Sequence, residues 1–383
     1  MIKLHGREYR IPQSKTVVIC LDGSDPRYVD DAIDCGAAPT LARWRSEGFY
    51  KVGEAWMPTF TNPNNLSIVT GAPPRVHGIS GNFYLDESTG EARPLSRASD
   101  VRGETVLTKL VERGVEVAVV TAKKKLLAML DPGKNAFSAE NAVKEATDLV
   151  GRPAPDVYSA DCSLFVLDLT VALLDRVTLV YASTTDYVQH KHDVGSSGAR
   201  DFYQAIDARL AKLDALGARV VLTADHGMNA KTKSDGTPRV TYLEPLVGPQ
   251  ARVILPITDP YVVHHGALGG AAMVYLNGAD ARAVTAALEA ADGVEAVLDR
   301  ATAASKFELP IDRIGDLMVL GTKGAVLGRS AEAHDLSAVG LGLRSHGALH
   351  ERHVPIISNR PAPAWAKARA LRNSDAFAIA LDQ

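Results

Sequence analysis

Acidic and histidine side chains recur in short clusters that lie far apart in the chain. The clusters are Asp22, Asp186 with His190, Asp225 with His226, and His346. Carboxylate oxygens and imidazole nitrogens are the ligands expected for Zn²⁺ or a similar divalent cation. Two residues four positions apart share one face of a helix, and two adjacent residues can share a bent loop. Together the clusters predict a site for two divalent cations.

Thr61, in the stretch Thr61–Asn65, is the candidate nucleophile. A threonine hydroxyl barely ionises at neutral pH, but a bound cation makes it competent. Pro63 suits the start of a helix, which Asn64–Val69 would continue. Thr61 would then lie near free backbone N–H groups that favour a phosphoryl group. The set therefore indicates chemistry on phosphorus or sulfur esters.

Each cluster also has a purely structural interpretation. Asp22 could form a turn, Asp186 and His190 a solvated helix face, and Thr61–Asn65 a capping loop. The joint occurrence of the clusters favours the functional interpretation. Four neighbouring residues are interpreted as surface or supporting residues only, namely His192, Asp193, His350 and His353.

Apolar, strand-like runs alternate with helical patterns along most of the chain. The expected strands are 16–21, 116–121, 177–181, 219–223 and 354–358; the expected helices are 39–47, one carrying Phe202, Ile206, Leu210, Leu213 and Leu216, and 364–381. This alternation predicts an α/β fold, a doubly wound and mainly parallel sheet with helices on both faces. Ligands of such sheets bind outside the carboxyl ends of the strands, where the acidic clusters fall.

The pattern changes after Gly227. Residues 230–336 hold turn-rich stretches, a strand at 272–276, a helix at 279–291 and a Gly-rich segment at 315–328. We interpret them as an inserted α+β cap domain, with 1–229 and 337–383 forming the catalytic core.

Composition excludes several classes of function. The 383 residues are 46% hydrophobic and 23% charged, with a net charge of −3. This balance gives no reason to expect nucleic-acid or membrane binding. Three cysteines without CxxC spacing predict no disulfide framework, and no apolar run is long enough to span a bilayer. A cytoplasmic location is expected; the oligomeric state stays open, with a homodimer as the assembly considered.

Several motifs match a known family. They are the strand with Asp22, Met57–Gly71, Val76–Asn82, Asp186–His190, Thr223–Met228 and Arg344–Gly347. In these the chain resembles the alkaline phosphatase superfamily, in its nucleotide pyrophosphatase/phosphodiesterase-like branch. Within that branch it is most similar to enzymes that hydrolyse the carbon–phosphorus bond of phosphonoacetate.

The resemblance implies two zinc ions per subunit. One would be bound by Asp186, His190 and His346, and the other by Asp22, Asp225, His226 and the Thr61 oxygen. Asn82 would donate its amide N–H to a phosphoryl oxygen in the transition state. Thr61 would attack phosphorus and form a phosphothreonine, which water then hydrolyses.

The substrate expectation rests on Thr121–Lys125. In this stretch Lys123 and Lys125 resemble the family's two alternating lysines that grip the substrate carboxylate, and Lys124 would point elsewhere. Taken alone, a Lys-rich triplet is ordinarily a solvated helix start. The full set expected to contact this small-molecule phosphonate is Lys123, Lys125, Asn82, Thr61 and His190.

Two other functions stay open. A zinc-dependent phosphodiesterase or nucleotide pyrophosphatase would need an aromatic platform, for which Phe83 and Tyr84 are candidates. A non-catalytic, zinc-stabilised phosphonate-binding protein would bind without turnover. A sulfatase would need Cys or Ser followed by x-Pro-x-Arg, and neither Cys20 nor Cys35 is so followed. His77 has no role in any of these hypotheses.

Overall fold

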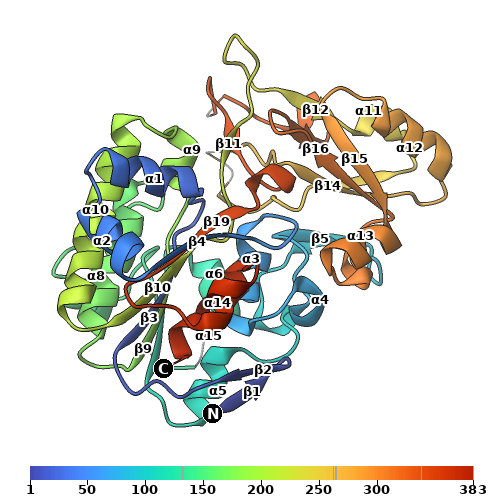
Figure 1. Ribbon diagram of the computed structural model, residues 1–383. Coiled ribbons are helices and arrows are strands. Elements are labelled where there is room, and N and C mark those ends of the chain that lie inside the picture. The colour runs from blue at the N-terminus through green and yellow to red at the C-terminus, as the bar shows by residue number, and fades with distance from the viewer. Residues whose placement is uncertain (131–132, 262, 264, 338, 383) are drawn as a thin grey trace.

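The computed structural model describes residues 1–383 except 131–132, 262, 264, 338 and 383. Its largest sheet has seven strands in the order β4-β19-β10-β3-β9-β7-β8 (Figure 1). Their bounds are β3 (Thr16–Cys20), β4 (Phe49–Glu54), β7 (Val117–Thr121), β8 (Ala136–Ser138), β9 (Leu179–Ser183), β10 (Arg219–Thr223) and β19 (His353–Ser358). The strands from β10 to β8 are parallel, and β19 is antiparallel to both its neighbours. The predicted mainly parallel α/β sheet is confirmed.

Helices cover both faces of this sheet because its central strand is apolar on both sides. All five residues of β3 are buried. Val17 and Ile19 face one core and Val18 and Cys20 the other, as strand alternation requires. The first core is covered by α1 (Pro26–Asp34), α2 (Pro39–Glu47), α8 (Ala160–Leu173) and α10 (Ser197–Ala215). The second is covered by α3 (Thr61–Thr70), α5 (Val106–Glu112), α6 (Lys124–Leu130) and α15 (Ala376–Leu381).

Helix α10 follows its apolar pattern up to its last turn. Phe202, Ile206, Leu210 and Leu213 are buried on the first core. The prediction was wrong for Leu216, which is 39% exposed. The helix ends at Ala215, and Gly217 turns the chain with a φ of +73° before β10 begins.

The C-terminal segment is not the single helix predicted for 364–381. It forms α14 (Ala364–Ala368), a 3₁₀ turn at Asn373–Asp375, and α15. The buried carboxylate of Asp375 causes the break, because it accepts the Arg372 backbone N–H and pairs with Arg7 and Arg369. A continuous helix would not present that carboxylate to all three groups.

A second, antiparallel sheet lies beside the first, at the upper right of Figure 1. Its order is β13 (Arg252–Ile254), β14 (Ala271–Tyr275), β16 (Leu317–Gly321) and β15 (Val294–Asp299). Helices α12 (Ala281–Glu289) and α13 (Arg300–Phe307) pack on it. The chain leaves and re-enters the core through β11 (Asn229–Ala230) and β18 (Arg344–Ser345), which pair antiparallel. The four strands of this sheet and its two helices fall within the predicted cap 230–336, whereas β18 lies beyond it; the limits of the cap stay a prediction.

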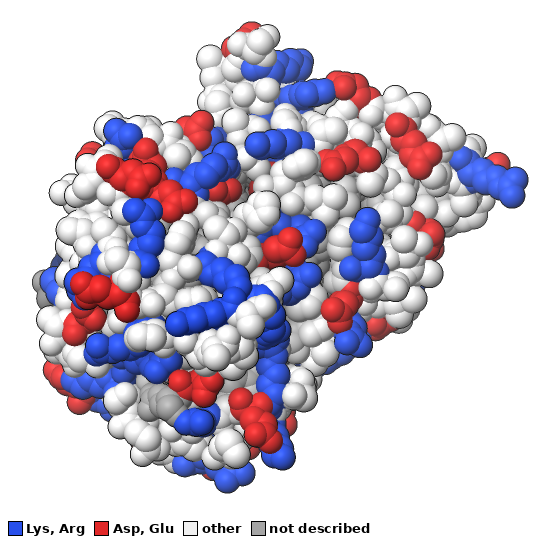
Figure 2. All heavy atoms as spheres, viewed as in Figure 1, with Lys and Arg blue, Asp and Glu red and all other residues white. Residues whose placement is uncertain are grey.

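The remaining elements are short. They are β1 (Ile2–Leu4), β2 (Arg7–Tyr9), α4 (Pro74–His77), β5 (Phe83–Asp86), β6 (Glu91–Pro94), α7 (Lys144–Val150), α9 (Tyr187–Lys191), β12 (Val240–Tyr242), α11 (Glu244–Val247) and β17 (Val326–Gly328). Among the described helices, none combines the length and the apolar character needed to cross a bilayer. On the face shown in Figure 2, positive and negative side chains are interspersed over both sheets' regions.

Candidate active site

Four adjacent parallel strands end at one edge of the sheet, and each delivers a charged side chain just beyond its end. β10 is followed by Asp225 and His226, β3 by Asp22, β9 by Asp186, and β7 by Lys123. All five residues are buried. The sheet therefore gathers side chains that are up to 204 positions apart in sequence, at the edge where such folds bind ligands.

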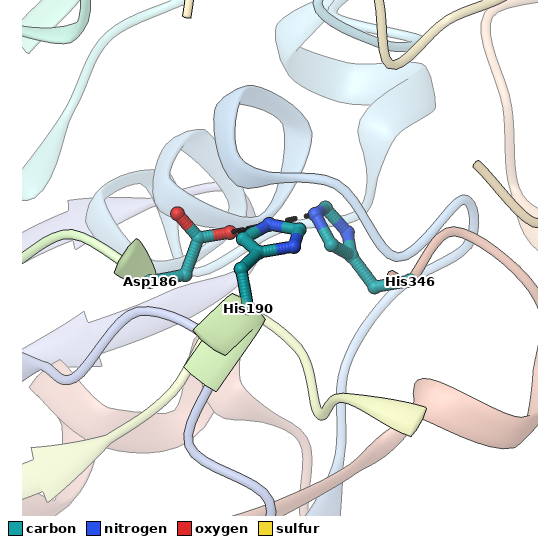
Figure 3. Close-up of side chains that lie close together, drawn as sticks. All are labelled: Asp186, His190 and His346. Carbon is teal, nitrogen blue, oxygen red and sulfur yellow. Dashed lines mark hydrogen bonds and ion pairs between the residues drawn. The ribbon is translucent and has the colours of Figure 1, made fainter. Parts of the chain in front are cut away.

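Asp186, His190 and His346 form one triad (Figure 3). Asp186 precedes the short helix α9, and His190 follows one turn later as the spacing predicted. Asp186 Oδ2 lies 2.9 Å from His190 Nε2 and 3.5 Å from His346 Nε2. Gly347 lets the chain pass the ring of Phe60, where an added Cβ would lie 2.5 Å from ring carbons.

Asp22, Asp225 and His226 form a second triad beside the first. His226 Nε2 lies 3.3 Å from Asp22 Oδ1 and 3.8 Å from Asp225 Oδ2. The rings of His226 and His346 stack with centroids 3.5 Å apart, so the two triads are in contact. In each triad the potential ligand atoms lie within 4.8 Å of one another.

The three histidines share one orientation. Nδ1 of His190, His226 and His346 lies 2.7, 2.9 and 2.7 Å from the backbone carbonyls of Arg344, Gly227 and Thr59, respectively. A carbonyl only accepts, so each Nδ1 carries the hydrogen and each Nε2 presents a lone pair to its triad. Metal-binding histidines are commonly oriented in this way.

The electrostatics of the second triad also fit a cation. Within the described part of the chain, neither carboxylate oxygen of Asp22 nor Nε2 of His226 has a hydrogen-bond partner. Burial, then the charges of Asp186 and Asp225, raise the pKa of Asp22 well above its usual value. Burial likewise raises the pKa of Asp225 to about 6. Buried carboxylates in this state are stabilised by added positive charge.

Thr61 is the first residue of α3, two positions before the Pro63 that suggested the helix start. Its carbonyl accepts a hydrogen bond from Asn65 Nδ2 at 3.0 Å, and the same amide lies 3.3 Å from Asp225 Oδ2. Asn65 thereby ties the start of α3 to the second triad. Asn82 Oδ1 accepts the backbone N–H of Asn62 at 3.2 Å, an orientation that directs the Asn82 N–H groups away from that bond.

One pocket brings together four of the five predicted substrate residues, while His190 lies in the first triad and does not line it. It is lined by Thr61, Asn62, Asn82, Pro94, Ser96, Lys123, Lys125, Leu126, Asp259 and Tyr261. Lys123 Nζ lies 3.5 Å from Asp186 Oδ1. Burial disfavours the ammonium, but Asp186 and Asp22 outweigh it and raise the pKa of Lys123. Lys124 is exposed, as expected.

Tyr84 is not placed to stack on a nucleobase. It is 6% exposed, and its ring lies beneath the guanidinium groups of Arg93 and Arg313, at 4.9 and 5.9 Å. Phe83 packs against the core of the second sheet. Neither residue lines the pocket that contains Thr61.

His77 has a structural role. Its Nδ1 accepts the Ile79 N–H at 3.2 Å, so Nε2 carries the hydrogen and donates to Ser67 Oγ at 2.9 Å. Burial lowers the pKa of His77 to about 3. The neutral ring joins α3 to α4.

Asp259 and Tyr261 were not predicted as site residues, although both line the pocket. His265 also reaches the site, with its ring 5.7 Å from that of His190. All three lie in the connection between β13 and β14. This connection carries no nucleophile-and-metal motif, and its turn-rich composition offers no signal that it returns to the catalytic core.

Comparison with known proteins identifies the family. The family described as type I phosphodiesterase/nucleotide pyrophosphatase matches residues 16–349. The chain is 45% identical to a phosphonoacetate hydrolase from Sinorhizobium meliloti, which has been solved in complex with phosphonoformate and with phosphonoacetate. That match covers 99% of this chain and 98% of the relative, with a TM-score of 0.93.

A more distant structure shares the fold. Murine ectonucleotide pyrophosphatase/phosphodiesterase 5, solved as an inactive variant in complex with AMP, is 17% identical. The match covers 96% of this chain and 93% of the murine chain, with a TM-score of 0.65. With its sheet, its two triads and a family match over residues 16–349, the chain belongs to the type I phosphodiesterase/nucleotide pyrophosphatase family of the alkaline phosphatase superfamily.

Proposed function

We propose that this protein hydrolyses the carbon–phosphorus bond of phosphonoacetate to acetate and phosphate. Family membership and the 45% identical relative support hydrolysis of a phosphonate or a phosphate ester. The observation that carries the narrower proposal is the pocket in which Thr61 and Asn82 lie with Lys123 and Lys125. Two ammonium groups opposite a nucleophile suit a phosphonate that also carries a carboxylate, because they can neutralise its second negative charge.

The two triads would bind one Zn²⁺ each, through Asp186, His190 and His346 and through Asp22, Asp225 and His226, with the Thr61 oxygen on the second ion. Bound zinc would supply Lewis acidity that favours the alkoxide of Thr61 and neutralises phosphoryl oxygens. The donor set supports this, because oxygen and imidazole nitrogen suit zinc and Asp22 and His226 retain unpartnered atoms in the described chain.

Thr61 Oγ1 attacks phosphorus, and the phosphorus–carbon bond breaks as the new bond forms. The bonding pair moves to the CH₂ carbon, where it delocalises into the carboxylate as an enolate. Lys123 and Lys125 bind that carboxylate and stabilise its growing charge, while Asn82 donates to a phosphoryl oxygen. The Thr61 hydroxyl gives up one proton as it attacks, and the CH₂ carbon takes up one proton to give acetate, so the protons balance. Water then attacks phosphorus, the bond between phosphorus and the Thr61 oxygen breaks, and the proton from water restores the Thr61 hydroxyl as phosphate leaves.

A zinc-dependent phosphodiesterase or nucleotide pyrophosphatase is the second candidate, since the family match itself favours it. The test measures phosphate release from phosphonoacetate beside cleavage of bis(p-nitrophenyl) phosphate, with a chelator-treated control. Chelator-sensitive preference for phosphonoacetate is expected. Preference for the diester would contradict phosphonoacetate as the substrate. Zinc binding without turnover of either compound would indicate a binding protein.

Replacing Thr61 with alanine tests the nucleophile. Thr61→Ala should reduce turnover of phosphonoacetate by at least about a thousandfold, because the group that attacks phosphorus is lost. Zinc content should remain close to wild type, as six side-chain ligands remain. Thr61→Ser is the matched control and should retain measurable turnover with a trapped phosphoserine. Near-wild-type activity of Thr61→Ala would exclude the threonine mechanism.

A further inference from the structure

The connection between β13 and β14 reaches from the cap to the pocket. Its residues Asp259 and Tyr261 line the pocket beside Lys123. The Tyr261 backbone N–H donates to Asp259 Oδ1 at 2.8 Å, so the two residues share one tight turn. Nε2 of His265 lies 3.6 Å from Asp259 Oδ1 and extends this contact toward the first triad.

Tyr261 is fixed at both its ring and its hydroxyl. The hydroxyl donates to Glu140 Oε2 at 2.5 Å. Glu140 Oε2 also accepts the Lys124 backbone N–H at 2.9 Å, at the start of the helix that carries Lys125. The Lys123 ammonium lies 5.1 Å from the centroid of the Tyr261 ring. Tyr261 thus contacts the Lys123 ammonium directly and, through Glu140, the start of the helix that carries Lys125.

We propose that Tyr261 determines the specificity of the pocket, by holding the Lys123 ammonium toward a small carboxylated phosphonate and by excluding the base or aryl group of a diester. This inference rests on the proposed function, because it assigns the substrate's second anionic group to Lys123.

An aromatic ring suits this task better than a carboxylate. Lys123 also pairs with Asp186 at 3.5 Å, and a cation bound by Asp186 would weaken that attraction. Asp259 already lines the pocket beside Lys123, and its carboxylate pairs with His265 at 3.6 Å. A further carboxylate would repel a doubly anionic substrate, whereas a ring face attracts the ammonium without carrying a net charge. The ring face occupied by Lys123 is also unavailable for stacking on a nucleobase.

The test measures kcat/KM of the zinc-loaded protein on phosphonoacetate and on bis(p-nitrophenyl) phosphate. Tyr261→Ala should lower the value for phosphonoacetate about tenfold, mainly through KM, the scale of a desolvated cation–π contact. Cleavage of the diester should rise, because the ring no longer occupies the space. Tyr261→Phe keeps the ring and should remain within about threefold of wild type on both substrates.

Two further variants complete the design. Tyr261→Leu keeps a large side chain without an aromatic face. If Tyr261→Ala does not fold, Tyr261→Leu tests whether phosphonoacetate hydrolysis depends on the ring face. Tyr242→Ala is the matched control, since Tyr242 lies on β12 against His334 and outside the pocket; both activities should be unchanged.

The outcomes separate the inference from the proposed function. Failure of the wild type to hydrolyse phosphonoacetate would overturn both. A wild type that turns it over, with a Tyr261→Ala variant that keeps the wild-type ratio of the two activities, would overturn the inference alone. An equal loss on both substrates would do the same, since it would mark Tyr261 as a purely structural residue.

Discussion

Two buried charged clusters in this molecule differ in how their polar atoms are satisfied. In the first, Lys231 and Glu351 are both fully buried, and Nζ lies 2.9 Å from Oε1. Lys231 also donates to the Lys323 carbonyl, and Glu351 accepts from Asn229 Nδ2 at 2.7 Å. We call Lys231 and Glu351 the junction cluster. Each of its two ions has an oppositely charged partner and further hydrogen bonds, so both charges are satisfied by protein groups.

The triads form the second cluster. Here three buried carboxylates, Asp22, Asp186 and Asp225, have the ammonium of Lys123 near them among the described residues. Both oxygens of Asp22 lack a hydrogen-bond partner among the described residues. An unpaired buried charge destabilises a fold. Buried charge alone therefore does not indicate a binding site. The buried charge that lacks partners within the described residues is the one at which we propose a cation.

Asp22→Asn should give the largest effect and the sharpest contrast. Activity should fall about a thousandfold or more, because the proposed cation, which would contribute several kcal/mol of transition-state stabilisation, would lose a ligand. The metal-free variant should nevertheless be more stable than the metal-free wild type by about 1 to 2 kcal/mol, the scale of one pKa unit. Urea unfolding of both chelated proteins measures the difference.

Asp175→Asn is the control for Asp22→Asn, because the Asp175 carboxylate is 77% exposed and pairs with Lys15 at the surface. Asp175→Asn should change neither activity nor stability appreciably. A destabilised Asp22→Asn protein in the absence of metal would contradict the interpretation of this cluster as unsatisfied.

In the junction cluster, Glu351→Gln should lower the stability of the fold, whereas Asp22→Asn should raise it in the metal-free protein. Glu351→Gln leaves the Lys231 ammonium buried without a carboxylate, which should cost about 3 to 5 kcal/mol of unfolding free energy. Pairing it with Lys231→Met should recover much of that loss, since no uncompensated charge remains. Urea midpoints of the two single variants and the double variant form the thermodynamic cycle; additive losses would contradict the pairing.

His77 supplies a smaller, pH-dependent case of a satisfied buried group. Its folded pKa of about 3 lies below its ordinary value of 6.5, so the unfolded chain binds the proton more readily between these limits. Stability should therefore fall as the pH drops below 6.5. Between pH 7 and 5 the chelated wild type should lose about 2 kcal/mol more than His77→Gln. Parallel pH dependences of the two proteins would show that His77 does not titrate on unfolding.

The metal-ligand candidates could be predicted because their positions follow from a general rule. Asp22, Asp186 and Asp225 each follow an apolar strand, and parallel strands end at one edge. The tertiary contacts of Asp259 and Tyr261 could not be predicted, because no local period specifies where a loop from another sheet returns. The prediction of a single C-terminal helix was wrong for a related reason. Asp375 accepts a hydrogen bond from Arg7, which lies 368 positions away in the sequence. The number and identity of the metals, and the roles of Asn82, Lys123 and Lys125, stay predictions.

The long sequence separation of the triad residues has a consequence for synthesis of the chain. When residues up to 345 have left the ribosome, Asp22, Asp225 and His226 are present, but the other triad still lacks His346. β19, which joins β4 to β10, has not yet been made either. Contacts of such separation form late because closing the intervening loops costs entropy. If each triad binds one cation as proposed, the nascent protein should acquire the cation of the Asp186 triad only after translation is nearly finished. A chain truncated before residue 346 should then bind one cation at most.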